Sequence, residues 1–298
     1  MKTLLIINPK SGKGAAKKIV PKLEKFFEKN YIDLDVYFTK KEMDGSRKAK
    51  AVCKSKKYDV IIASGGDGTM NEVLNGIAGS GMKKKPLFGM IPLGTENVLA
   101  QEMKIPFNHL KAAKVIVEGI LTEKTKKIDL GNANGRFFVL MTGIGFDAHV
   151  ASKLEPFLKK ILGRAVYPLT AWNELFKYKH SDMDIVVDKK IKTRGSYVVV
   201  GNTKFYGAGM KITPNADISD GFLDVCIFKG NDVFKFIKFV AGVFAEKHID
   251  TADIEYHKAK EVSIKSKDKV LCHVDCEVMG TTPVKVKVYP GIVEMIVP

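Results

Sequence analysis

The order of predicted strands and helices in the first 120 residues constrains the fold most strongly. Each of four apolar runs with the composition of a buried strand precedes a segment with helical spacing. The runs are 3–8, 33–39, 59–64 and 87–92. Strands that alternate with helices predict a parallel sheet covered by helices on both faces. We therefore expect an N-terminal α/β domain with a doubly wound parallel sheet over residues 1–122.

The pattern changes in residues 123–298. Short β-rich runs follow one another here, most of them separated by turn signals, and helix-like segments interrupt them at about 161–178 and 231–247. This arrangement predicts a C-terminal, mostly antiparallel β-sandwich domain. The last run, 291–298, fits either sheet, including a return of the final strand to the first domain.

Three loops with unusual chemistry follow strands of the first domain. They are 8–14, 65–69 and 92–97, and all three contain glycine. In open parallel sheets, ligands bind beyond the carboxyl ends of the strands. Glycine lets the backbone approach a ligand closely, and the helix that begins near Thr69 offers unpaired N–H groups to an anion. Because the hydroxyls of Thr69 and Thr95 can also donate to phosphate oxygens, these loops predict a phosphate site.

Asp67 is the exceptional residue of this predicted site. A carboxylate beside a phosphate is repelled unless a cation lies between them, and Mg²⁺ has that role in phosphoryl-transfer sites. The stretch 65–69 therefore predicts a site for a magnesium–nucleotide complex. A Walker motif is absent from the sequence. A match to G-x-G-x-x-[GA] at 143–148 lies in the β-rich half, without the acid that dinucleotide binding requires further on.

Charge and cysteine content restrict the partners. The chain has 49 Lys and Arg against 33 Asp and Glu, a formal net charge of +16, which favours anionic partners. Nucleic acid is not expected, because no RNA- or DNA-binding motif is present. Four scattered cysteines imply no disulfide framework, and Cys272, His273 and Cys276 lack the second cluster that would close a zinc site. Without a signal peptide or a membrane-spanning run, we expect a cytoplasmic protein.

The motifs taken together resemble one family. "NPKSGKG" (8–14) followed by "GGDGTMNEVLNG" (65–76) is similar to the catalytic domain of diacylglycerol and sphingosine kinases, and in particular to the soluble bacterial lipid kinases of that family. "PLGTENVLA", "IDLGNANGRFFVLMTGIGFDA", "NADISDGFLDV" and "VDCE" follow in the family's order and extend the resemblance over nearly the whole chain.

The resemblance implies a two-domain lipid kinase that uses ATP and Mg²⁺. Its expected partners are a lipid substrate bearing a hydroxyl, diacylglycerol or a related lipid, and the anionic inner face of the membrane as a peripheral contact. A homodimer is left open. The family's nucleotide contacts fall on Asn8, Pro9, Lys10, Ser11, Gly12, Thr39, Gly66, Asp67, Gly68, Thr69, Met70, Asn71, Glu72 and Thr95.

The resemblance also assigns metal and acid–base roles. The aspartates that hold the catalytic Mg²⁺ through water correspond to Asp67 and Asp129, and the general base corresponds to Asp275 or Glu277. Bacterial members also carry a structural cation. Here it would use the Asp220 side chain and main-chain oxygens near Asp217 and Phe222. Hard oxygen ligands around a glycine turn suit Mg²⁺ or Ca²⁺.

Two departures from the family pattern keep alternatives open. Val98 stands where the family often has aspartate, and Cys276 replaces the glycine between the paired acids. A cysteine would be strained if that position needs a positive φ. The alternatives are a small-molecule kinase of the NAD kinase type and a non-catalytic protein that binds nucleotide or lipid.

Overall fold

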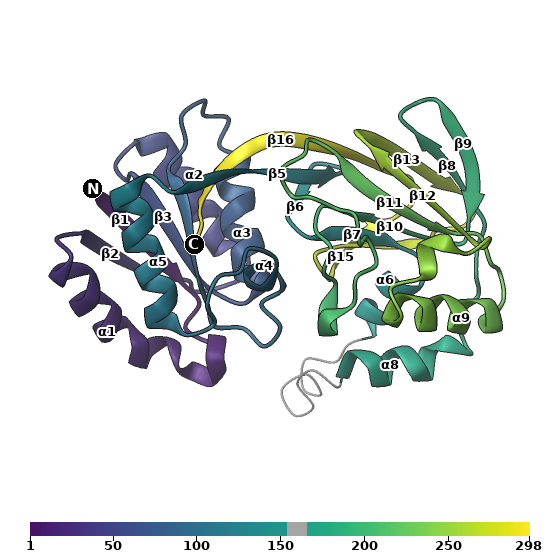
Figure 1. Ribbon diagram of the computed structural model, residues 1–298, viewed down its shortest axis with the longest axis horizontal. Helices are drawn as coiled ribbons and strands as arrows, with labels where there is room; N and C mark the ends of the chain where they lie inside the picture. The colour runs from purple at the N-terminus through teal and green to yellow at the C-terminus, as the bar shows by residue number, and fades with distance from the viewer. Residues whose placement is uncertain (154–165) are drawn as a thin grey trace. The chain divides into compact units, whose positions relative to one another are not determined.

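The computed structural model describes residues 1–153 and 166–298, and its contacts divide the chain into two compact units (Figure 1). The first unit comprises Met1–Ile128 and Gly291–Pro298, and the second comprises Asp129–Pro290. The strands β5 (Thr125–Ala133) and β16 (Val284–Ile296) contain both unit boundaries, so the chain passes between the units twice within β-structure.

The first unit is a parallel sheet with helices on both faces. Its strand order is β2 (Asp33–Phe38), β1 (Lys2–Ile7), β3 (Val60–Gly65), β4 (Leu87–Pro92) and the C-terminal end of β16. The end of β16 lies parallel to β4, with Met295 opposite Phe88, so the final run of the chain adds a strand to this sheet. Strands β1, β3 and β4 are buried almost throughout, as a sheet covered on both faces requires.

The helices of the first unit form two contacting pairs. Helix α1 (Ala16–Lys29) contacts α5 (His109–Thr122), and α2 (Asp44–Ser55) contacts α3 (Asp67–Ala78). A 3₁₀ turn, η1 (Ser11–Gly14), precedes α1, and a short helix, α4 (Val98–Glu102), precedes α5. The expected doubly wound α/β domain is confirmed.

The second unit is a β-sandwich. One sheet has the order β12 (Ile254–Ala259), β11 (Leu223–Phe228), β10 (Tyr197–Gly201), β7 (Met141–Ile144), β14 (Leu271–Val274) and β15 (Glu277–Thr281), with antiparallel neighbours throughout. The other contains β16, β13 (Glu261–Ser266), β8 (Met183–Val187) and β9 (Ile191–Gly195), joined by β5 and β6 (Arg136–Phe138). Residues from both sheets form one apolar core that includes Ile144, Ile185, Val198, Val225 and Val286.

The helices of this unit contact the six-stranded sheet or one another. They are α6 (Phe146–Ser152), α8 (Val166–Leu175) and α9 (Val233–Phe244). The unit also contains the short 3₁₀ turns η3 (Gly207–Gly209) and η4 (His248–Asp250). Phe236 and Phe239 of α9 stack against Phe228 of β11. The mostly antiparallel sandwich is confirmed, and the part of the first expected helix that falls on 161–165 lies outside the described residues.

Candidate functional site

The three glycine-containing loops of the first unit meet at the carboxyl ends of its strands. Asn8 N–H donates to the Ser64 carbonyl (3.0 Å), and Leu93 N–H donates to the Gly65 carbonyl (2.7 Å). A methyl group built on Gly12 would lie 3.4 Å from the Leu93 carbonyl oxygen. The loops 8–14, 65–69 and 93–97 therefore form one contiguous backbone surface, as the parallel sheet predicts. We call this surface the glycine corner.

Gly66 and Gly94 make the glycine corner possible. A Cβ on Gly94 would lie 2.5 Å from the Gly66 Cα, which no real side chain can tolerate. The Asn97 side chain fixes the same loop, because its amide oxygen accepts from Gly94 N–H (2.8 Å) and its amide nitrogen donates to the Gly94 carbonyl (2.9 Å). Two backbone segments thus approach one another without intervening side chains and leave their polar groups near the surface.

Helix α3 begins at this corner. Gly66 is its N-cap in an extended conformation, and among the described residues no side chain caps it. The positive end of the helix dipole therefore favours an anion at this corner. Thr69 is buried against Gly65, since a Cβ on Gly65 would overlap its hydroxyl oxygen. This geometry suits a phosphate group.

Asp67 lies in the first turn of α3, where its Oδ1 accepts from Leu99 N–H (3.1 Å). Burial raises the pKa of the Asp67 carboxyl. The backbone N–H groups of Val98 and Leu99 oppose this increase, and nearby Glu96 adds to it. A divalent cation at this carboxylate would offset the cost of burying its charge, so the residue fits the proposed Mg²⁺ role. Val98, which replaces the family's aspartate, is a buried residue of α4.

The other residues predicted to bind the nucleotide lie at the glycine corner or next to it in the first unit. Asn8 Oδ1 accepts from Lys10 N–H (3.0 Å) and closes the turn that also contains Pro9, Ser11 and Gly12. Thr39 follows β2, where its N–H donates to Ile7 (2.9 Å), and Thr95 is exposed between β4 and α4. Gly68 lies in the first turn of α3, whereas Met70 and Asn71 are buried in that helix.

Glu72 contacts helix α2. Its two carboxylate oxygens accept from the N–H groups of Met43 (2.9 Å) and Gly45 (3.0 Å). These are donors at the start of α2, which begins after a left-handed Met43. The Glu72 carboxylate therefore connects α3 to the N-terminus of α2, the kind of contact that stabilises a helix terminus.

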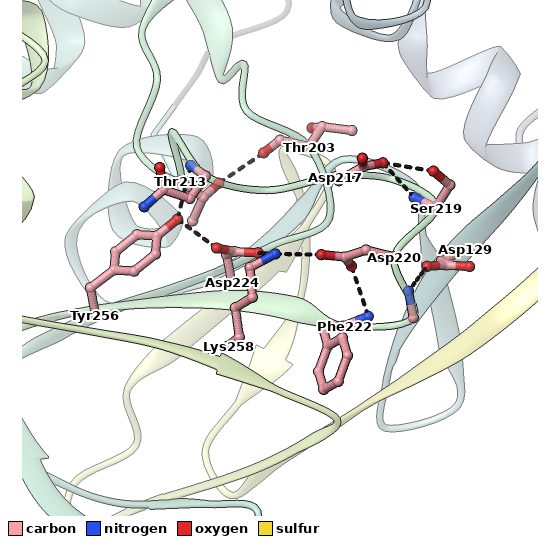
Figure 2. A network of polar contacts seen from close by, with 12 residues as sticks. Asp129, Thr203, Thr213, Asp217, Ser219, Asp220, Phe222, Asp224, Tyr256 and Lys258 are labelled. Atoms are coloured by element: carbon pink, nitrogen blue, oxygen red, sulfur yellow. Dashed lines mark hydrogen bonds and ion pairs between the residues drawn. The ribbon is translucent and has the colours of Figure 1, made fainter.

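In the second unit, Asp129 is bound to a loop of residues 217–222. Asp129 Oδ2 accepts from Gly221 N–H at 2.6 Å (Figure 2). Asp129 N–H donates to the Ile218 carbonyl (2.7 Å). The buried Asn202 amide donates to the Asp129 and Val139 carbonyls, both at 2.9 Å. The position of the Asp129 carboxylate thus depends on the conformation of this loop.

The loop itself has cross-bonds where a structural cation was expected. Asp217 Oδ1 accepts from the Ser219 N–H (3.0 Å) and hydroxyl (2.7 Å), and Asp220 Oδ1 accepts from Phe222 N–H (3.0 Å). The other oxygen of Asp220 pairs with the ammonium group of Lys258 (Figure 2). Within the described residues, no group of three or more His, Cys, Asp or Glu side chains could hold a metal ion. At this loop, the carboxylate of Asp220, which is the one side chain of the expected ligand set, is already paired with the ammonium group of Lys258.

One of the paired acids lies in a two-residue turn and the other directly follows it. Asp275 (φ 46°) and Cys276 (φ 65°) connect β14 to β15, both in left-handed conformations, as in a type I′ hairpin. The Asp275 carboxylate accepts from the N–H groups of Val139 (3.0 Å), Leu140 (3.0 Å) and Met141 (2.9 Å). Glu277 is paired with Arg136. The turn therefore requires positive φ where the cysteine stands, and the cysteine adopts it.

A buried His–Asp pair, which no motif in the sequence indicated, supports this turn. His273 Nε2 and Asp147 Oδ2 are 2.7 Å apart, and both side chains are almost fully buried. Cys276 N–H donates to His273 Nδ1 (3.2 Å), so Nε2 carries the proton and donates to Asp147. Burial raises the pKa of the neighbouring Cys272 thiol to about 11, which makes it a poor metal ligand.

The predicted residues thus divide between the units. Asp67 and the nucleotide-binding candidates belong to the first unit, whereas Asp129, Asp217, Asp220, Phe222, Asp275 and Glu277 belong to the second. Lys258 and Asn97 also contribute to the polar networks. A lysine and an asparagine carry no sequence signal by themselves, and the contacts that make them important join distant or sharply turned segments.

Two family models match this chain. A family model described as "Diacylglycerol kinase catalytic domain" matches residues 2–133. Another, described as "YegS C-terminal NAD kinase beta sandwich-like domain", matches residues 141–297. The diacylglycerol kinase of Bacillus subtilis (strain 168) is 30% identical over 282 residues, which cover 94% of this chain and 90% of the relative.

Further relatives give the same result. The diacylglycerol kinase of Staphylococcus carnosus (strain TM300) is 30% identical over 281 residues, covering 94% of this chain and 89% of the relative. A crystal structure of a diacylglycerol kinase from Bacillus anthracis str. Sterne matches with a TM-score of 0.82 and 28% identity. The match covers 100% of this chain and 97% of that one. The resemblance seen in the motifs is confirmed.

Proposed function

This chain belongs to the diacylglycerol kinase family, and from that premise we propose that it transfers the γ-phosphoryl group of ATP to a hydroxyl of a membrane lipid, diacylglycerol or a related lipid. The glycine corner carries the proposal. Its bare backbone at Gly66 and Gly94, the uncapped start of α3 and the carboxylate of Asp67 combine an anion site with a cation ligand.

In this proposal, the ATP phosphates bind at the glycine corner. The α3 N-terminus and the hydroxyls of Thr69 and Thr95 would donate hydrogen bonds to phosphate oxygens. The turn 8–12 and Thr39 would complete the nucleotide contacts. Catalysis of phosphoryl transfer depends mainly on positioning and electrostatic stabilisation, so a rigid backbone cradle is an appropriate surface for it.

Asp67 and Asp129 would hold the catalytic Mg²⁺. When bound, this ion neutralises charge that develops on the phosphoryl oxygens. Asp67 supports the role by its position in the first turn of α3 and by the burial of its carboxylate. Asp129 supports it by being held in place by Gly221 N–H.

Asp275 and Glu277 are the candidates to accept the proton of the lipid hydroxyl. Three backbone N–H groups orient Asp275, and Arg136 orients Glu277. Asp275→Asn and Glu277→Gln distinguish them, because the substitution of the true proton acceptor should cause the greater loss of kcat. A general base typically contributes about 10²- to 10⁴-fold to the rate.

The second unit has features that suit a membrane surface. Helices α8 and α9 expose large apolar side chains, which are Leu169, Trp172, Phe234 and Phe244. Phe176, which directly follows α8, is also exposed. Lys235 and Lys238 lie beside the exposed face of α9, and the chain has a formal net charge of +16. No helix in the described parts of the chain is long and apolar enough to cross a membrane. We therefore assign these helices to peripheral contact with anionic lipid, where apolar side chains enter the interface and lysines approach headgroups.

The test is transfer of radiolabelled γ-phosphate from ATP, with Mg²⁺, to a panel of lipids in mixed micelles that contain anionic lipid. NAD is the alternative acceptor. Asp67→Asn should lose most of the turnover while keeping the circular dichroism spectrum of the wild type. Glu24→Gln, which removes an exposed carboxylate on α1, is the matched control and should retain turnover.

Each outcome assigns a function. A labelled lipid that disappears with Asp67→Asn supports the lipid kinase and identifies its acceptor. Labelled NADP would instead assign the protein to the small-molecule kinases. Binding of ATP without transfer to any acceptor would assign it to the non-catalytic proteins.

A further inference from the structure

Lys258 stands where the family resemblance expects a metal. We propose that its ammonium group acts as a covalently attached cation that holds the 217–222 loop, so that this loop needs no divalent ion. Because the same loop binds Asp129, we further infer that Lys258 is a positioning residue for phosphoryl transfer, and this second part rests on the proposed function.

The position of Lys258 follows from the register of the six-stranded sheet. Lys258 on β12 lies directly opposite Asp224 on β11, and its Nζ is 3.7 Å from Asp224 Oδ2. The same Nζ pairs with Asp220 Oδ2, so one ammonium group contacts two carboxylates (Figure 2). Opposite charges on directly opposed residues stabilise an antiparallel pair.

Asp224 depends on this cation. Its side chain is 1% exposed, and burial raises the pKa of its carboxyl. Oδ1 accepts from the Tyr256 hydroxyl (2.8 Å), whereas Oδ2 accepts no hydrogen bond from the described residues. A buried carboxylate oxygen without a donor is costly unless a positive charge is near it. In the described part of the chain, Lys258 supplies the only positive charge recorded beside Asp224, and the nearby Asp220 carboxylate increases the need for it.

The contact reaches Asp129 through consecutive residues. The ammonium group fixes Asp220, and the next residue, Gly221, donates its N–H to Asp129 Oδ2 at 2.6 Å. Phe222 N–H donates a hydrogen bond to Asp220 Oδ1 and closes the turn. Loss of the ammonium group should therefore release the loop and, with it, one of the bonds that orient Asp129.

The first experiment compares thermal unfolding of the wild type and Lys258→Met in excess EDTA and in Mg²⁺ or Ca²⁺, without nucleotide. Methionine keeps the length and apolar stem of lysine while removing the charge. Lys229→Met is a matched control. Lys229 is 42% exposed and its partner Glu255 is 28% exposed, against 44% for Lys258 and 27% for Asp220.

We expect the wild type to unfold at the same temperature in EDTA as in Mg²⁺ or Ca²⁺. In EDTA, Lys258→Met should unfold at least about 4 °C lower than Lys229→Met, because two carboxylates lose their shared cation. A divalent ion should restore part of this loss, and equilibrium dialysis should count one more Ca²⁺ per chain than for the wild type.

Two results would overturn the proposal. One is a wild-type protein that is destabilised by EDTA, which would show that a metal holds the loop. The other is a Lys258→Met variant that unfolds like Lys229→Met in both solutions. Neither measurement involves phosphoryl transfer, so the stability result stands whether or not the protein proves to be a lipid kinase.

The positioning role has its own measurement. Lys258→Met should lower kcat while leaving KM for ATP within about twofold, because the nucleotide-binding candidates lie in the other unit. Lys258→Arg, which keeps the positive charge, should recover most of the lost kcat. Equal losses in the Met and Arg variants, or a raised KM with unchanged kcat, would refute the role.

Discussion

Gly143→Ala should severely destabilise the second unit. Gly143 lies on β7 directly opposite His273 on β14, in the middle of the six-stranded sheet. A Cβ at this position would lie 2.0 Å from Asp147 Oδ2 and 2.5 Å from His273 Nε2. A single methyl group would therefore overlap both members of the buried pair.

The size of the effect follows from that pair. Neither side chain has solvent to move into, since His273 is 0% and Asp147 is 6% exposed. Separation of the 2.7 Å contact breaks the bond between a buried carboxylate and a buried imidazole, and no solvent reaches the site to replace it. Breaking a buried pair of this kind costs about 3–5 kcal/mol. For a unit of this size, that loss lowers the unfolding midpoint by roughly 6–20 °C.

The assay is urea unfolding followed by circular dichroism and by the fluorescence of Trp172, the single tryptophan, which lies in the second unit. Gly207→Ala is the control, because a Cβ at Gly207 meets no atom within 4 Å. The cost of Gly143→Ala should also shrink in an Asp147→Ala background, where the closer of the two overlaps is gone. A Gly143→Ala protein within about 1 kcal/mol of the wild type would refute the reasoning.

Three further predictions concern the candidate site. Asp67→Asn should be more stable than the wild type at pH 7 without Mg²⁺. Burial raises the pKa of the Asp67 carboxyl in the folded protein. The wild type therefore loses stability as the pH rises above the pKa of the same carboxyl in the unfolded chain, which is about 3.9. Urea midpoints should show this gap at neutral pH and lose it below pH 4, and a less stable variant at pH 7 would contradict it. Cys276→Gly should raise the free energy of unfolding in urea by up to about 1 kcal/mol, because relief of a left-handed non-glycine residue outweighs the added freedom of the unfolded chain. A lower free energy of unfolding would show that the cysteine is not strained. Trp172→Ala should reduce sedimentation with anionic vesicles several-fold while leaving solution ATP binding unchanged, and equal sedimentation would exclude α8 from the membrane contact.

The sequence predicted the first unit well because its signals are local. Strand length, helical periodicity and the strand-end glycines all lie within a few residues of one another, and parallel topology then brings the loops together. The same local signals indicated Asp67. They also gave the sandwich class of the second unit, because short strands separated by turns are local features too.

The contacts that could not be predicted join residues far apart in the chain. Glu72 reaches the start of α2 across 29 and 27 residues, and His273 reaches Asp147 across 126. Lys258 is one of 49 basic residues, and only the β11–β12 register places it against Asp224. Pairing register and helix approach are tertiary properties, so no spacing in the sequence encodes them.

The G-x-G-x-x-[GA] match at 143–148 shows why a motif needs its structural context. Gly143 leaves room for the His273–Asp147 pair, and Gly145 begins α6 with a φ of 119°, which side chains rarely adopt. Both glycines are explained by an antiparallel sheet and a buried polar pair. A dinucleotide fingerprint instead needs a parallel strand before a helix N-terminus. His273 Nδ1 also accepts a hydrogen bond from Cys276 N–H in the turn between β14 and β15. Because Gly143 leaves the space that His273 occupies, it also contributes to the shape of the turn that presents Asp275 and Glu277.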